Sequence, residues 1–62
     1  MRTINEMRQL LNVSRAEFSR RYNIPIRTLE DWEAERRKPA VYVLQLLERA
    51  VTEDYDHQNE GS

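Results

Sequence analysis

The sequence contains no cysteine, one glycine and two prolines in 62 residues. The absence of cysteine excludes disulfides, and a single histidine, His57, does not make a metal site. The scarcity of glycine disfavours long flexible loops and a glycine-rich phosphate-binding loop. A chain this short forms one domain at most and buries only about 60% of the surface that its unfolded form exposes. We therefore expect a small domain without a cofactor or an enzymatic pocket.

Long apolar runs are also absent. No segment approaches the length of a membrane-spanning helix, and residues 1–6 lack the apolar stretch of a signal peptide. These observations predict a soluble, cytoplasmic protein without a membrane partner.

The net charge of −1 conceals an uneven distribution. Residues 1–51 hold ten Arg and Lys against seven acids, a balance of +3, whereas residues 52–62 hold four acids and no Arg or Lys, a balance of −4. The position of charge, more than its total, decides what a surface attracts. The pattern indicates a basic domain over residues 1–51 and an acidic tail over 52–62, which we expect to be disordered because it lacks apolar periodicity.

Apolar residues recur at helical spacing in four segments, with no strand alternation of useful length. The spacing predicts helices near residues 3–11, 15–22, 25–34 and 40–52. The residues expected to face the core are Ile4, Met7, Leu10, Leu11, Phe18, Tyr22, Leu29, Trp32, Ala40, Leu44, Leu47 and Val51.

Both ends of the second segment carry clear local signals. Ser14 and Glu17 have the spacing of a capping box at the start of a helix. Asn23 tolerates the left-handed backbone that ends a helix, and Pro25 suits the start of the next one. Such a tight break between two short helices predicts a helix-turn-helix arrangement.

The stretch SRAEFSRRYNIPIRTLEDWEAERRKP resembles the Cro and phage-repressor class of helix-turn-helix domains, the XRE-like regulators. The resemblance covers about residues 3–51. It rests on an ordered series of motifs: Arg15-Ala16-Glu17-Phe18-Ser19, Asn23-Ile24-Pro25, Trp32-Glu33 and Arg36-Arg37-Lys38-Pro39. Two positions depart from the family, which commonly has glycine where Asn23 and Glu35 stand, and nothing after Val51 resembles its fifth helix.

The resemblance implies an all-α, lambda-repressor-like domain of four helices that binds double-stranded DNA as a transcription regulator. The third helix would enter the major groove, where Arg27 suits a guanine and Ile26 a thymine methyl. Thr28 would bond a base or a phosphate. Asp31, four residues after Arg27, would hold the guanidinium in place. An acid facing phosphate is repelled, although a carboxylate can accept a hydrogen bond from cytosine. Glu30 has no assigned role.

Other positions receive supporting roles. The proposed phosphate contacts flank the third helix and are Arg15, Arg20, Arg36, Arg37 and Lys38, for which a plain solvated surface is the alternative. The resemblance also implies a partly buried ion pair between Arg8 and Glu33.

The fourth helix carries more apolar surface than one face of a small domain requires. One apolar strip on this helix either packs against the first helix or pairs with a second copy of the chain. It consists of Tyr42, Val43, Leu46 and Ala50. A dimer is favoured because two-half-site operators are read by dimers. A rival function is an antitoxin-like or adaptor module that binds a partner protein, and the acidic segment favours it.

Overall fold

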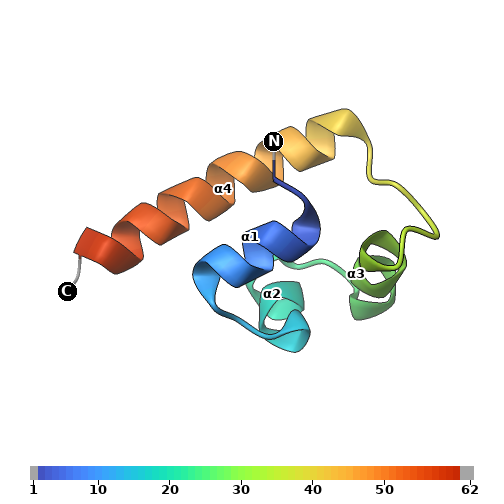
Figure 1. Ribbon diagram of the computed structural model, residues 1–62, viewed down its shortest axis with the longest axis horizontal. Coiled ribbons are helices and arrows are strands. Elements are labelled where there is room, and N and C mark those ends of the chain that lie inside the picture. Colours follow the sequence, from blue (N-terminus) through green and yellow to red (C-terminus); the bar gives the residue numbers. More distant parts are fainter. Residues whose placement is uncertain (1, 61–62) are drawn as a thin grey trace.

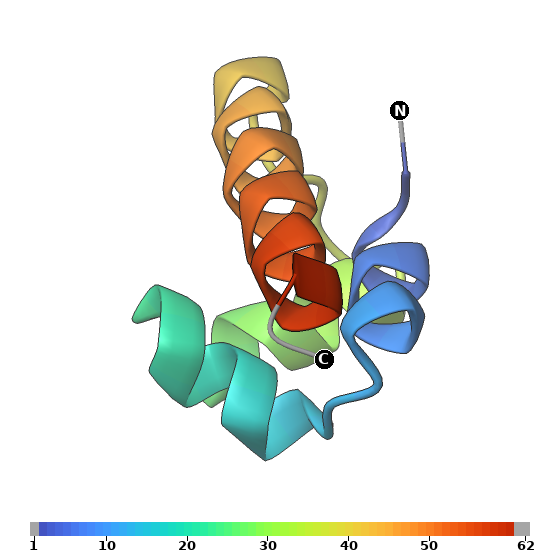
Figure 2. The same cartoon turned by 90° about the vertical axis from the view of Figure 1, so that its left-hand side faces the viewer.

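The computed structural model describes residues 2–60, which form four α-helices and no strand (Figure 1). Helices α1 (Ile4–Leu11), α2 (Arg15–Tyr22) and α3 (Ile26–Glu33) have eight residues each, and α4 (Val41–Glu60) has 20. The three short helices lie together, with the long α4 on one side of them (Figures 1 and 2). The predicted all-α class with four helices is confirmed. No helix within residues 2–60 has both the length and the apolarity that crossing a bilayer requires.

Asparagine ends the first two helices. Asn12 and Asn23 adopt left-handed backbone conformations, with φ of 57° and 56°. In each case the following amide donates to a carbonyl five residues earlier: Val13 to Arg8 at 3.2 Å, and Ile24 to Ser19 at 3.0 Å. Asparagine is one of few non-glycine residues that adopt this conformation readily. Two sharp helix ends are therefore formed without glycine.

Helix α3 ends in the same way at a less suitable residue. Glu35 has φ of 63°, and the amide of Arg36 donates to the carbonyl of Asp31 at 2.9 Å. The amide of Glu35 donates to the carbonyl of Trp32 at 3.2 Å, which completes a Schellman motif. Because a glutamate side chain crowds the backbone in this conformation, the turn carries local strain.

Side chains cap the starts of the first two helices. Thr3 and Glu6 form a reciprocal capping box at α1. At α2, Ser14 Oγ accepts from the amide of Glu17 at 3.1 Å, but the Glu17 carboxylate accepts from Arg20 at 2.7 Å. The capping box predicted for Ser14 and Glu17 is thus half formed.

Among residues 2–59, the residues that are buried as a whole are apolar, and they form the core: Ile4, Met7, Leu11, Phe18, Leu29, Leu47 and Val51. Tyr22 and Trp32 are partly buried and pack against this core, and the Phe18 and Tyr22 rings lie 4.7 Å apart between centroids. Leu10 and Leu44 are also partly buried. Ala40 was expected to face inward but is exposed, because it precedes the first residue of α4.

Helix α4 is longer than predicted. A disordered tail was expected from Thr52, but the helix continues through Glu60. Val51 is fully buried and Tyr55, one turn later, packs against the core. Tyr22 of α2 donates a hydrogen bond to Asp54, and Figure 2 shows this end of α4 above α2 and beside α1. Contacts with another helix therefore hold the first acidic turns; the remaining tail residues, 61 and 62, lie outside the described range.

Candidate nucleic-acid interface

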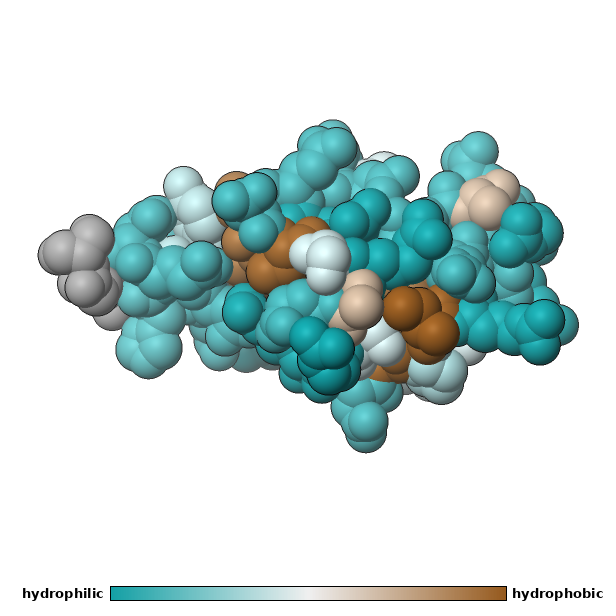
Figure 3. All heavy atoms as spheres, turned by 90° about the horizontal axis from the view of Figure 1, so that it is seen from below, coloured by the Kyte–Doolittle hydropathy of each residue, from teal (hydrophilic) through white to brown (hydrophobic). Residues whose placement is uncertain are grey.

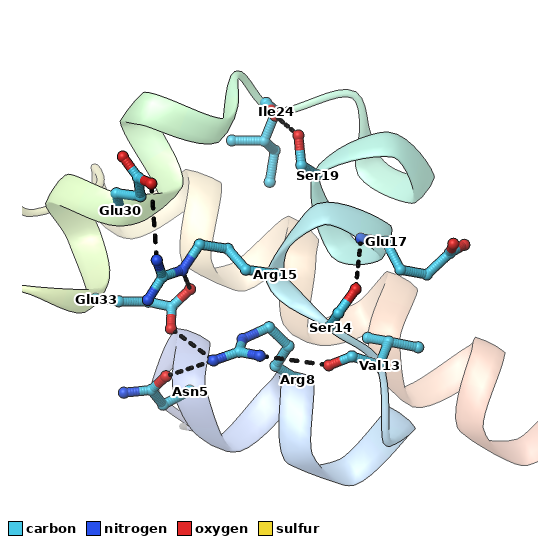
Figure 4. Close-up of polar contacts among 10 residues, drawn as sticks. All are labelled: Asn5, Arg8, Val13, Ser14, Arg15, Glu17, Ser19, Ile24, Glu30 and Glu33. Atoms are coloured by element: carbon cyan, nitrogen blue, oxygen red, sulfur yellow. Dashed lines mark hydrogen bonds and ion pairs between the residues drawn. The ribbon is translucent and has the colours of Figure 1, made fainter.

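The turn between α2 and α3 is held by bonds to one residue. The Ser19 hydroxyl donates to the carbonyl of Ile24 at 2.6 Å (Figure 4). The Ser19 carbonyl accepts from the amides of Asn23 and Ile24. These bonds fix the direction in which the chain leaves α2, and hence the angle at which α3 begins.

The first turn of α3 is open to solvent. Pro25 occupies the capping position, and no side chain among residues 2–60 caps the helix there. The first amides of a helix lack intrahelical partners and carry the positive end of its dipole, which favours an anion. Ile26 is 43% exposed, Arg27 is exposed and Thr28 is half-buried. The three predicted reading residues thus lie at the accessible start of the helix.

A buried carboxylate joins three helices. Glu33 of α3 has a side chain that is only 4% exposed. Its Oε1 accepts from Arg8 Nη2 of α1 at 2.9 Å, and its Oε2 accepts from Arg15 Nε of α2 at 3.2 Å (Figure 4). Arg8 also donates to the carbonyl of Val13 at 3.4 Å and to Asn5 at 3.5 Å. The structure therefore brings Arg8 and Glu33 together, as expected, and adds Arg15 to the pair.

Arg15 also contacts a second carboxylate. Its Nη1 lies 3.7 Å from Glu30 Oε2, and both side chains are nearly half exposed. The sequence predicts a phosphate contact for Arg15 and no role for Glu30. The contact depends on the angle between α2 and α3, which no local pattern reports. The only hint in the sequence was an outward-facing acid without a partner on its own helix.

The predicted pairing of Asp31 with Arg27 is wrong. Arg36 Nε donates to Asp31 Oδ1 at 2.9 Å. The left-handed Glu35 ends α3, and the amide of Arg36 bonds back to the carbonyl of Asp31, which brings the Arg36 side chain near that residue. Arg27 forms no ion pair with any residue in the described range. Asp31 therefore closes the turn after α3 and does not orient Arg27.

The remaining predicted phosphate contacts fall into two groups. Arg20 and Arg36 are well exposed but already pair with Glu17 and Asp31. Arg37 and Lys38 are exposed and pair with no carboxylate in the described part of the chain. Viewed from below the molecule, the side of α2 and α3 is mainly hydrophilic, with small hydrophobic areas (Figure 3). Positive charge without an internal partner is thus concentrated at the two ends of α3.

Three ionisable groups in the described part of the chain have shifted pKa values. The hydrogen bond from Arg20 lowers the pKa of the Glu17 carboxyl, and that from Thr3 lowers the pKa of the Glu6 carboxyl. Burial and the bond to Asp54 raise the pKa of the Tyr22 hydroxyl. Within residues 2–60 there is no group of His, Asp and Glu side chains suited to holding a metal ion.

Two helices joined by a tight turn, the second with an open first turn and cations at both ends, define a helix-turn-helix DNA-binding domain. A family model described as helix-turn-helix matches residues 4–54. The chain therefore belongs to this family, the Cro/C1-type helix-turn-helix domains, and the resemblance seen in the sequence is confirmed. The family is one of DNA-binding domains and not of enzymes. No curated protein and no solved structure matches the chain.

Proposed function

We propose that the protein is a small transcriptional regulator that binds duplex DNA sequence-specifically, with the first turn of α3 in the major groove. The observation that carries this proposal is the position of Glu33. Its bonds to Arg8 of α1 and Arg15 of α2 hold α3 against two other helices, while Ile26 and Arg27 face solvent. A reading helix has to be held firmly if its side chains are to select bases.

In the proposed complex with DNA, Arg27 contacts a guanine, because its planar donors match the O6 and N7 acceptors of that base. Ile26 packs on a thymine methyl, and Thr28 bonds a phosphate or a base edge. Asp31 has its carboxylate on Arg36, so it accepts from a base edge only when Arg36 has exchanged that carboxylate for a phosphate.

Phosphate contacts come first from Arg37 and Lys38, which have no internal partner in the described range. Arg20 and Arg36 join them by exchanging an exposed carboxylate for a phosphate. Such exposed ion pairs contribute about 0–1 kcal/mol each, so the exchange costs little. Arg15 is the most constrained of the five, because Glu33 and Glu30 both contact it.

We further propose that the regulator acts as a homodimer through α4. Tyr42 and Leu46, one turn apart, are 67% and 60% exposed. Val43 and Ala50 are half-buried, and Val43 packs against the core, so these two residues border the contact and do not form its centre. An exposed apolar strip of this kind on a small domain is typical of an interface.

The same strip favours a second candidate function, an antitoxin-like or adaptor module whose α4 binds a partner protein. The two candidates differ in the behaviour of the purified chain. A homodimer dissociates on dilution in sedimentation or light-scattering measurements, and Leu46→Glu abolishes it. A chain that stays monomeric at all concentrations, with or without DNA, contradicts the homodimer and leaves α4 to a different partner.

DNA binding is tested by selecting duplexes from a randomised pool and titrating the enriched sequence at two salt concentrations. We expect affinity to fall steeply with salt, and Lys38→Ala to reduce the salt slope by about one. Arg27→Ala should relax preference at one base position, at a cost of about 1–3 kcal/mol for the preferred sequence. A pool that yields no enriched sequence and no salt-sensitive binding would contradict the proposal.

A further inference from the structure

Glu30 has the most exposed side chain of the three acids in α3. Its side chain is 46% exposed, and it lies one helical turn beyond Ile26 and Arg27 on the solvent side of α3. A carboxylate there faces the phosphates of any DNA that α3 approaches. A carboxylate without a nearby cation at that position would be repelled by the phosphates and would weaken DNA binding. Its negative charge therefore needs a cationic partner close by.

Arg15 is that partner. Its Nε is bonded to the buried Glu33, which Arg8 also holds, and its Nη1 lies 3.7 Å from Glu30 Oε2 (Figure 4). The guanidinium offsets the charge of Glu30 and limits the positions that its carboxylate can occupy. The second oxygen, Glu30 Oε1, has no hydrogen-bond donor among the described residues. A positioned acceptor therefore faces outward from α3.

We propose that Glu30 is a specificity-determining residue that accepts a hydrogen bond from the N4 amino group of a cytosine, with Arg15 as its positioning residue. This inference rests on the proposed DNA-binding function. In the major groove, only cytosine and adenine present amino donors. Adenine also presents the N7 acceptor beside its amino group, which repels a carboxylate, whereas cytosine has no acceptor at that edge. The carboxylate thus selects cytosine.

The test is duplex selection with the full chain and with Glu30→Gln. A glutamine amide has both a donor and an acceptor, which match the N7 and N6 of adenine. We expect the wild-type chain to enrich cytosine at one position and Glu30→Gln to enrich adenine at that same position, with the other positions unchanged. In competition titrations, the wild-type preference for the cytosine duplex over its adenine variant should be on the order of tenfold and should reverse in Glu30→Gln.

Glu17→Gln is the matched control, because Glu17 is a similarly exposed acid that pairs with Arg20 and lies on α2. It should raise the affinity for all duplexes alike and leave the preference unchanged. Arg15→Lys keeps the charge, but an ammonium group cannot reproduce the planar contact to both glutamates. It should weaken the cytosine preference more than the affinity for unrelated duplexes.

If the wild-type chain and Glu30→Gln enrich the same base at every position of the duplex, the role of Glu30 is overturned. Enrichment by the wild-type chain of a base other than cytosine at the affected position would overturn it too. Those outcomes leave DNA binding itself intact, because the wild-type chain still enriches a sequence. A wild-type chain that enriches no duplex would instead overturn the proposed function, and this inference with it.

Discussion

Glu33 Oε1 accepts a hydrogen bond from Arg8 Nη2 at 2.9 Å, so α3 and α1 are joined by an ion pair whose carboxylate is almost fully buried. A carboxylate taken out of water is costly unless charged donors satisfy it, and here two guanidiniums do so. The pair sets the position of α3, the helix that carries the proposed reading residues.

Loss of Arg8 should therefore destabilise the domain strongly. In Arg8→Ala, Glu33 stays buried with only Arg15 as a partner, and we expect the free energy of unfolding to fall by on the order of 3–5 kcal/mol in urea titrations. Arg20→Ala, which breaks an exposed pair, should have a much smaller effect. If both substitutions lower the free energy of unfolding equally, the Arg8–Glu33 pair stabilises the domain no more than an exposed ion pair does.

The strained end of α3 offers a stabilising substitution. Glu35 has φ of 63°, a conformation that glycine adopts without steric cost. We expect Glu35→Gly to raise the thermal midpoint, by a gain in unfolding free energy of about 1 kcal/mol. Ala34→Gly is the control, since Ala34 has φ of −84° and glycine there only adds unfolded-state entropy. A lower thermal midpoint for Glu35→Gly would mean that contacts of the glutamate side chain stabilise the fold by more than its left-handed backbone destabilises it.

The Tyr22 hydroxyl should make the domain sensitive to alkali. Its pKa is raised in the folded state, mainly by burial and also by its bond to Asp54. The folded state then holds this proton more tightly than the unfolded chain. The resulting stabilisation is complete below the ordinary tyrosine pKa of about 10 and declines as the pH rises beyond it.

Tyr22→Phe removes the ionisable group, so its unfolding free energy should change less between pH 9 and about 11 than that of the wild type. Near neutral pH the substitution should cost about 1 kcal/mol for the lost hydrogen bond. Tyr42→Phe, at an exposed position, controls for general alkaline effects. Identical pH profiles for Tyr22→Phe and the wild type would contradict the buried contact with Asp54.

The extension of α4 should contribute to stability. Tyr55 packs against the core, so Tyr55→Ser should lower the free energy of unfolding by about 2 kcal/mol. Glu53→Ser, on the exposed side of the same helix, should have little effect. Amide exchange offers a second readout: protection of residues 52–56 in the wild type should be lost in Tyr55→Ser. Rapid exchange of this segment in the wild type would favour the disordered tail that the sequence suggested.

Local chemistry made much of the architecture predictable. Asn12, Asn23 and Pro25 each restrict the backbone in a way that depends on the residue itself. The helical spacing of apolar residues identified most of the core, because one stripe of each helix has to be buried. The ends of the first three helices were accordingly predicted to within one residue.

Local signals in the sequence set where the short helices begin and turn, because capping and left-handed propensities act over a few residues. Apart from the Arg8–Glu33 pair, the partners of the charged side chains depend on tertiary packing. Arg15 pairs with Glu30 and Glu33 because of the angle between α2 and α3. Arg36 pairs with Asp31 because the left-handed Glu35 turns the chain at the end of α3. The polar end of α4 is helical because Tyr22 and the core lie beside it. Contacts between segments distant in the chain depend on the packing of the whole domain, which no short stretch of residues encodes.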